Sequence, residues 1–305
     1  MLKQPGLPST SPTSRKPLAR LALRGGGGEP ILFAQTIGSH GCAALAPAAV
    51  APDYTWYRTA LRVDERAIPI TLTADAGELV IHADVRLGAA QSRFVVAQVT
   101  RMFRLGDDLS PFYRAVAGDP DLHFAALGAG RLLASPTVFE DVVKTICTTN
   151  CAWSATVRMT AALADLGEGA FPSPERVAAT DARWFTDIAR MGYRGPYIAA
   201  LGRDVAAGRL DLERLLPAHG MSDDDVEAAL LELPGVGPYA AAHIMQLLGR
   251  HRRLILDSWT RPTYLARSGK KRATDTAMRR AFARYGEYAG LAFWLYLTRD
   301  WVPQP

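Results

Sequence analysis

The spacing of apolar and polar positions changes near Ser92 and predicts strands before that point and helices after it. The segments Tyr54–Val63, Ile68–Thr73 and Glu78–Asp84 are rich in β-branched and aromatic residues and are separated by turn residues. Such segments predict a small antiparallel sheet. From Ser92 onward, apolar residues recur at the spacing of one helix face. The order of elements therefore predicts an α+β fold that is mainly helical.

Several segments of the second part have the length and spacing of helices. Ser135 is a suitable N-cap and Pro136 a suitable first residue for a helix that buries an apolar stripe starting at Phe139. Other helices are expected at 109–117, 121–127, 154–166, 174–179, 182–190, 194–207 and 275–301.

The stretch Leu231–Asp257 carries the most specific pattern in the chain. Ser222 followed by Asp225 predicts a helix from about Asp223. The sequence Pro234-Gly235-Val236-Gly237 ends that helix in a short turn, and Pro238 suits the first turn of a second helix that ends near Gly249. A short apolar run then places Asp257 at the head of a further helix. The pattern predicts two helices joined by a glycine hairpin, with a carboxylate following.

The free amides of such a hairpin, beside a helix N-terminus, suit a phosphate oxygen. The alternative is that Gly235 and Gly237 form an ordinary turn and that Asp257 only caps a helix.

Composition limits the class of protein. The chain has 305 residues, about half of them apolar, and no apolar run long enough to span a bilayer. Its three cysteines (Cys42, Cys147 and Cys151) do not form a disulfide framework and indicate a reducing, cytoplasmic environment. They are also too few for a four-cysteine iron–sulfur cluster, so none is expected.

The net charge of +5 is unevenly distributed. Residues 1–28 contain five basic and no acidic side chains and are rich in Pro, Ser and Gly, which predicts a disordered basic tail. Residues 250–284 contain eleven Lys and Arg against two Asp. A basic segment on an otherwise neutral chain is typical of a nucleic-acid-binding surface, although a solvated charged helix face is the alternative.

The hairpin together with Asp257, twenty residues after Gly237, resembles the helix-hairpin-helix DNA glycosylases. Shorter matches in the same order assign the chain to the branch of the 8-oxoguanine and bacterial 3-methyladenine (type II) DNA glycosylases. These matches are Phe139-Glu140, Ile146–Asn150, Gly192-Tyr193-Arg194 and Gly286–Gly290.

The resemblance implies an architecture and a set of partners. An N-terminal sheet domain with connecting helices would occupy residues 29–130, and two helical lobes around a cleft would occupy residues 131–305. The partner would be damaged double-stranded DNA, bound by a monomer. No cofactor would be required, although backbone carbonyls of Leu231, Leu233 and Val236 could hold a monovalent cation at the hairpin.

The resemblance also implies which residues carry the chemistry. Asp257 matches the catalytic aspartate, which would stabilise the positive charge that develops on the deoxyribose. Bifunctional members have a lysine where this chain has Tyr239, and a tyrosine cannot form a Schiff base. We therefore expect a monofunctional enzyme without AP lyase activity.

Further residues match positions that contact DNA or the flipped base. Asn150 would enter the gap left by that base, and Arg194 would read its former partner. The hairpin residues Gly235, Val236 and Gly237 and the basic side chains of Arg250, Arg253, Arg261 and Lys270 would bind the backbone. The aromatic pocket expected for the base consists of Trp153, Tyr193, His243, Trp259, Phe293 and Trp294.

The substrate expected from these matches is an alkylated purine. His243 stands where the oxidised-guanine enzymes have a cysteine, and Phe293 stands where they have a base-binding glutamine. An aromatic pocket suits cationic alkylated bases. An oxidised-purine glycosylase, a non-catalytic lesion-binding module and a structural DNA-binding subunit remain alternatives, because a fold does not fix chemistry.

Overall fold

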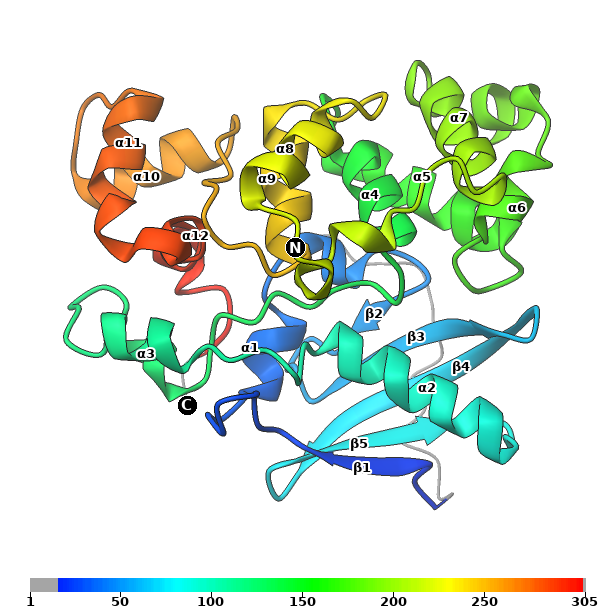
Figure 1. The fold of residues 1–305 in the computed structure, drawn as a ribbon, viewed down its shortest axis with the longest axis horizontal. Coiled ribbons are helices and arrows are strands. Elements are labelled where there is room, and N and C mark those ends of the chain that lie inside the picture. Colours follow the sequence, from blue (N-terminus) through cyan, green and yellow to red (C-terminus); the bar gives the residue numbers. More distant parts are fainter. Residues whose placement is uncertain (1–15, 304–305) are drawn as a thin grey trace.

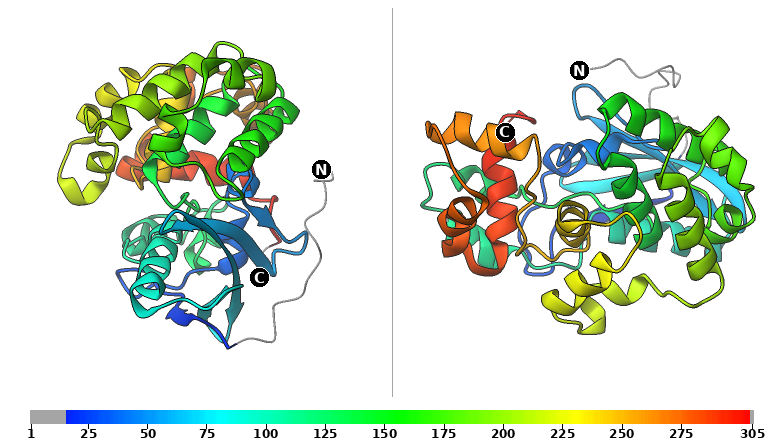
Figure 2. Two further views of the ribbon diagram at one scale, coloured as in Figure 1. Left: turned by 90° about the vertical axis from the view of Figure 1, so that its right-hand side faces the viewer. Right: turned by 90° about the horizontal axis from the view of Figure 1, so that it is seen from above.

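The computed structural model describes residues 16–303 and has a helical layer above a smaller layer that contains the sheet (Figures 1 and 2). Helix α2 lies across the sheet, and the helices of the second half of the chain form the upper layer in two groups, α4–α9 and α10–α12 (Figure 1). This arrangement confirms the predicted α+β fold.

The sheet is antiparallel and has the strand order β1-β5-β4-β3-β2. Asp64 and Glu65 connect β3 to β4, and Ala76 and Gly77 connect β4 to β5, all four with positive φ. Such two-residue turns match the twist of the strands that they join. The strands are β1 (Ala19–Ala22), β2 (Ala49–Val50), β3 (Trp56–Val63), β4 (Arg66–Asp75) and β5 (Glu78–Ala83).

Strand β1 corrects the prediction of a disordered tail over residues 1–28. Residues 1–15 lie outside the described part of the chain. Within the remainder, β1 pairs with β5 along its whole length, and Arg24 forms a β-bridge with Pro30. The buried carboxylate of Glu29 stabilises the Gly25–Gly28 turn, because it accepts the Gly27 amide and also forms an ion pair with Arg131. These tertiary contacts were not predicted, because the composition of residues 16–28 is typical of a disordered segment.

The helical elements follow one another with short connections. They are α1 (Phe33–Ile37), η1 (Gly41–Ala44), α2 (Ala89–Met102), α3 (Ser110–Val116), η2 (His123–Leu127), α4 (Val138–Thr148), α5 (Trp153–Leu166), α6 (Pro174–Ala178), η3 (Trp184–Ile188), α7 (Arg194–Ala206), η4 (Glu213–Leu215), η5 (Pro217–His219), α8 (Asp223–Leu231), α9 (Pro238–Leu247), α10 (Thr260–Ser268), α11 (Asp275–Phe282), η6 (Ala283–Tyr288) and α12 (Ala289–Thr298).

One predicted helix start was wrong. The N-cap of α4 is Thr137, whose hydroxyl accepts the Glu140 amide, so Ser135 and Pro136 precede the helix. The region 275–301 is helical, as expected, and consists of α11, η6 and α12, with an interruption at Gly286, which has φ 57° and ψ −122°. Among residues 16–303, no helix combines the length and the apolar character that crossing a membrane requires.

Three apolar cores hold the molecule together. One lies between the sheet and α2, a second among α4–α9, and a third among α10–α12. Helix α3 and η2 pack into the third core through Phe112 and Phe124. The expected division at residue 130 therefore separates this segment from the core in which it lies.

Candidate active site

The predicted helix-hairpin-helix is present as α8, a connection over residues 232–237 and α9. The Ser222 hydroxyl accepts the Asp225 amide, as the sequence predicted. Gly235 has φ 85°, and a Cβ there would lie 2.9 Å from the Tyr197 ring. Gly237 has φ −102° and open space around it, so only Gly235 needs the conformational freedom of glycine.

Three amides of the hairpin face no acceptor. Within residues 16–303, the N–H groups of Gly235, Gly237 and Tyr239 donate no hydrogen bond. They surround the N-terminus of α9, where the helix dipole favours an anion. The turn therefore has the donors that a phosphate oxygen requires.

Asp257 is half-buried at the turn that leads into α10. Its Oδ1 accepts the amides of Trp259 at 2.8 Å and Thr260 at 2.6 Å, and the Thr260 hydroxyl accepts the Asp257 amide. One carboxylate oxygen thus fixes the side chain. The other oxygen, Oδ2, has no hydrogen-bond partner in the described part of the chain.

Tyr239 lies on the first turn of α9, where its ring packs near His243. Its hydroxyl is 3.1 Å from the hydroxyl of Thr148. Burial raises the pKa of the Tyr239 phenol above its usual value, and the nearby Cys42 and Asp257 raise it further. The Tyr239 phenol is therefore uncharged at neutral pH.

Asn150 follows the end of α4, and Arg194 contacts the backbone next to it. Asn150 is exposed and has φ 45°, an uncommon conformation for a residue other than glycine. Arg194 is buried, donates to the carbonyl of Thr149 and lies 4.5 Å from the centre of the Tyr193 ring. This burial corrects its expected role as a direct reader of a base, because the guanidinium instead holds the backbone just before Asn150.

The expected aromatic pocket is only partly present. The side chains of Trp153, Tyr193 and Trp259 are exposed at the surface. The Trp153 ring covers Gly41, and the Trp259 ring packs on Trp294, which is nearly buried. Phe293 is fully buried among Tyr264 and Phe282 in the third core, so its placement in the pocket was wrong. The sequence does not distinguish these two placements, because a helix that lines a pocket and a helix buried in a core have the same spacing of apolar residues.

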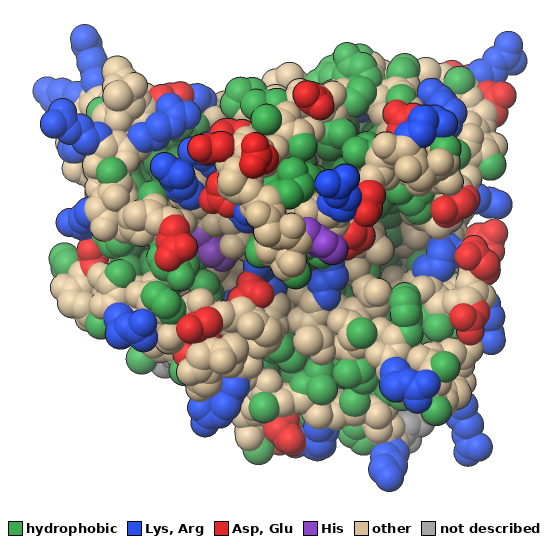
Figure 3. Space-filling model, viewed as in Figure 1, with side chains coloured by type: hydrophobic (Ala, Val, Ile, Leu, Met, Phe, Trp, Pro, Cys, Tyr) green, Lys and Arg blue, Asp and Glu red, His purple; other side chains and the backbone are tan. Residues whose placement is uncertain are grey.

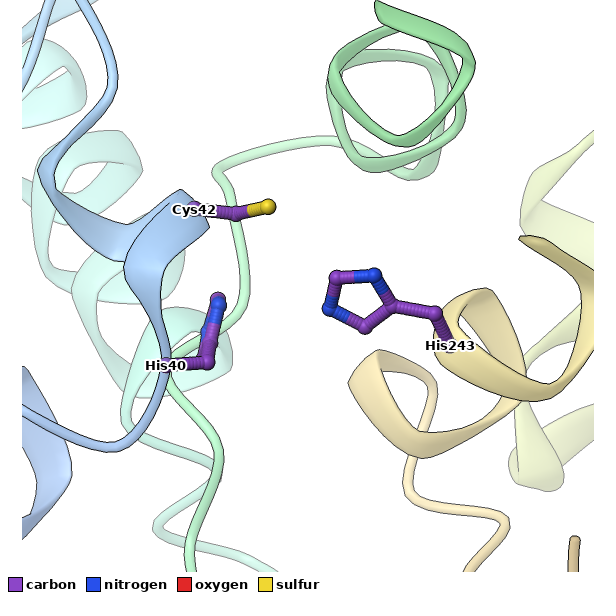
Figure 4. Close-up of side chains that lie close together, drawn as sticks. All are labelled: His40, Cys42 and His243. Carbon is purple, nitrogen blue, oxygen red and sulfur yellow. The ribbon is translucent and has the colours of Figure 1, made fainter. Parts of the chain in front are cut away.

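His243 is buried and points toward His40 and Cys42 (Figure 4), which flank the Gly41 that the Trp153 ring covers. The His40 and His243 ring centres are 5.8 Å apart at an interplanar angle of 87°. Burial lowers the pKa of His40 to about 4 and that of His243 to about 3, and it raises the pKa of the Cys42 thiol to about 12. This cluster was not predicted from the sequence, because positions 40–42 and 243 meet only in the fold.

Ion pairs neutralise much of the basic segment at residues 250–284. Arg250 is buried, bonded to Asp223 and the Leu215 carbonyl, so its expected phosphate contact was wrong. Arg253 pairs with Asp224 and Glu227, and Arg261 with Asp275, so neither is a free cation. The side chains left without an acidic partner in the described chain are those of Arg252, Lys270, Lys271, Arg272, Arg279 and Arg280.

Positive side chains gather over α10 and α11, at the upper left of Figure 3, whereas acidic side chains gather over α8. Lys270 is exposed in this positive group and lies over the Tyr264 ring. Of the hairpin carbonyls expected to hold a cation, that of Leu233 accepts the Val236 amide. Those of Leu231 and Val236 accept no loop hydrogen bond within residues 16–303, and the cation site stays a prediction.

Two relatives align with the chain, although no family model matches it. It is 28% identical over 163 residues to a DNA-3-methyladenine glycosylase of Bacillus subtilis, an alignment that covers 50% of this chain and 53% of the relative. It is 25% identical over 282 residues to a Methanothermobacter thermautotrophicus protein named "Probable N-glycosylase/DNA lyase", with coverage of 80% and 87%. The chain thus spans about half of the first relative and most of the second.

Solved structures show the same fold. A 3-methyladenine DNA glycosylase from Archaeoglobus fulgidus superposes with a TM-score of 0.68 at 17% identity, covering 93% of this chain and 100% of that one. The 8-oxoguanine glycosylase/lyase of Clostridium acetobutylicum superposes with a TM-score of 0.63 at 17% identity, covering 82% and 87%.

Proposed function

Because the relatives and structural neighbours of this chain are DNA glycosylases of the helix-hairpin-helix type, we propose that it is a base-excision-repair DNA glycosylase. It flips a damaged purine out of duplex DNA and hydrolyses the N-glycosidic bond without cutting the strand. The observation that carries this proposal is the carboxylate of Asp257, held through one oxygen beside a hairpin with three unpaired amides.

Asp257 supplies the charge that the reaction needs. Departure of the base leaves positive charge on the deoxyribose, and a fixed carboxylate stabilises that charge. Two backbone amides hold Oδ1, which leaves Oδ2 to face the sugar or the attacking water. The base then departs and water adds to the sugar, so no covalent enzyme intermediate forms.

The hairpin positions the sugar by binding one backbone phosphate. The amides of Gly235, Gly237 and Tyr239 would donate to its oxygens at the N-terminus of α9. The unpaired cations over α10 and α11 would attract the flanking phosphates. Asn150, exposed and held by Arg194 through the preceding carbonyl, would enter the gap that the flipped base leaves.

Tyr239 supports a monofunctional reaction. The phenol is neutral and has no amine with which to attack the sugar. The exposed rings of Trp153 and Trp259, the latter packed on Trp294, would suit an electron-poor alkylated purine by stacking. This account agrees with the names of the Bacillus subtilis and Archaeoglobus fulgidus proteins.

A second candidate is an oxidised-purine glycosylase. It is favoured by the N-glycosylase/DNA lyase relative, which aligns over 80% of this chain, and by the 8-oxoguanine glycosylase/lyase structure. The two candidates differ in the lesion released and, if the second resembles those proteins fully, in strand cutting.

A panel of duplex oligonucleotides, each with one alkylated, oxidised or deaminated base, tests the proposal. We expect release of an alkylated purine, with strand breaks only after alkali treatment. Release of 8-oxoguanine would favour the second candidate. Binding of every duplex without release of any base would contradict both candidates and leave a non-catalytic DNA-binding module.

A further inference from the structure

We propose that His40, Cys42 and His243 form a binding site for one Zn²⁺ ion. One nitrogen of each histidine and the Cys42 sulfur lie within 4.8 Å of one another, and all three side chains are buried (Figure 4). His40 and Cys42 come from the N-terminal end of η1, and His243 comes from α9, about two hundred residues later. The site would thus join the segment beside the sheet to the helix that follows the hairpin.

The hydrogen bonds of His40 prepare it as a ligand. Its Nε2 is 2.8 Å from the Leu133 carbonyl, which can only accept, so the proton is on Nε2. The Nδ1 atom then carries a lone pair, is buried and has no partner. A histidine that donates one ring N–H to a backbone carbonyl and binds through the other nitrogen is the usual arrangement at metal sites.

The unpaired ring nitrogens of His243 are a second reason to expect a bound metal ion. Both of its ring nitrogens are buried, and neither has a hydrogen-bond partner in the described structure. A buried polar group without a partner costs about 1–3 kcal/mol, so a purely packing role leaves these atoms unexplained. A bound metal ion would satisfy one ring nitrogen of each histidine.

The donor set selects the ion. Two imidazoles and a thiolate are ligands of zinc, whereas calcium and magnesium prefer oxygen. Tetrahedral zinc holds such atoms about 3.3–3.8 Å apart, given bond lengths of about 2.0–2.3 Å. The present spacing of up to 4.8 Å requires a closure of about 1 Å, which rotation of the Cys42 and His243 side chains can provide. Water would fill the fourth position.

The metal site and the proposed hydrolysis use different residues, because Asp257 is not a ligand. His243 was also expected at the base pocket, so the test of the metal site measures metal binding and stability, and base release separately tests the proposed function. The expected consequence is stability, because an ion that binds only the folded chain raises the free energy of unfolding.

The experiment measures metal binding by the full-length, untagged chain after chelator treatment. We expect one Zn²⁺ per chain by mass spectrometry of the metal, and a rise in the melting temperature on adding Zn²⁺. Co²⁺ added in its place should give a thiolate-to-metal charge-transfer band. Cys42→Ser and His243→Gln should each weaken Zn²⁺ binding by at least about 100-fold, because loss of even an outer partner costs 10- to 100-fold.

Cys151→Ser is the matched control, because it removes a thiol outside the cluster. It should keep the Zn²⁺ and the Co²⁺ band. Circular dichroism and the metal-free melting temperature establish that the variants fold. No Zn²⁺ bound by the wild-type chain, or equal Zn²⁺ in folded wild type, Cys42→Ser and His243→Gln, would overturn the proposal.

Discussion

At the scale of single residues, the site depends on two neighbours with opposite tasks. Asp257 is held by backbone amides through one oxygen and presents the other. Tyr239 stands where the bifunctional enzymes that the chain resembles have a lysine, and burial raises the pKa of its phenol further above neutral pH. In the proposed function, the first arrangement serves hydrolysis of the glycosidic bond, and the second lacks the amine that strand cleavage would need.

Replacing Tyr239 by lysine should introduce the missing nucleophile. Burial would lower the pKa of the new amine and leave part of it uncharged at neutral pH. We expect borohydride to trap a covalent protein–DNA adduct with the Tyr239→Lys variant and not with the wild type or Tyr239→Met. A trapped adduct with the wild type would contradict the assignment of a monofunctional enzyme.

His251 should make the fold sensitive to acid. Burial, and then the positive charges of Arg104 and Arg131, lower its pKa from 6.5 to about 3. Between these values the unfolded chain binds a proton that the folded chain does not, so stability falls as the pH falls below 6.5. The expected loss approaches 1.4 kcal/mol per pH unit for this one group.

Urea unfolding at pH 6.5 and pH 5 measures that loss. His251→Phe keeps an aromatic ring beside Tyr288, with which His251 stacks at 6.3 Å. The variant should lose roughly 1–2 kcal/mol less than the wild type between the two pH values. Equal losses in the two proteins would show that His251 is not buried in its neutral form.

At the scale of elements, the two glycines of the hairpin have different roles. Gly235 is needed for the conformation of the turn, whereas Gly237 has an ordinary backbone conformation and open surroundings. Gly237 lies at the N-terminus of α9. In the proposed phosphate site, a side chain at Gly237 would occupy the space that the phosphate needs.

The two alanine variants should therefore behave differently. Gly235→Ala should destabilise the fold by about 1–2 kcal/mol, because of its positive φ and the contact with Tyr197. Gly237→Ala should change the free energy of unfolding by less than about 0.5 kcal/mol and still weaken DNA binding, as fluorescence anisotropy would measure. Unchanged DNA affinity in Gly237→Ala would contradict the phosphate site.

Local pattern was sufficient to predict the elements with strong signals. The strands β3–β5, the cap at Ser222 and the start of α9 at Pro238 agree with the sequence analysis. Strand β1 and the break at Gly286 were not predicted, because each depends on partners distant in the sequence or on a single backbone angle. The burial of Phe293 and Arg250 was missed for the same reason.

At the scale of the whole molecule, ion pairs neutralise much of the positive charge that the sequence concentrates in residues 250–284. Four arginines of residues 250–284 pair with acidic side chains outside that segment, namely Arg250, Arg253, Arg267 and Arg284, whereas Arg261 pairs with Asp275 inside it. A sequence cannot show these pairs, since most of the partners lie far along the chain. The surface that remains positive is smaller and lies over α10 and α11 (Figure 3).

Lys270 and Lys271 should contribute to DNA affinity through charge alone. Replacing both by glutamine should reduce the slope of log K against log salt by up to about 2, since each phosphate contact contributes about 0.9. Arg66→Gln is the control, because this exposed arginine lies on the sheet, remote from α10 in Figure 1. An equal change in slope for the control would contradict a localised DNA-binding surface.

The most direct measurement of the central claim is single-turnover base release by wild type and Asp257→Asn on the best lesion of the oligonucleotide panel. Asparagine still accepts the Trp259 and Thr260 amides, so the variant should keep its melting temperature and its DNA affinity. We predict that its rate of base release falls at least about 100-fold, as expected for loss of a preorganised charge. A folded Asp257→Asn variant that releases the base at the wild-type rate would contradict the account.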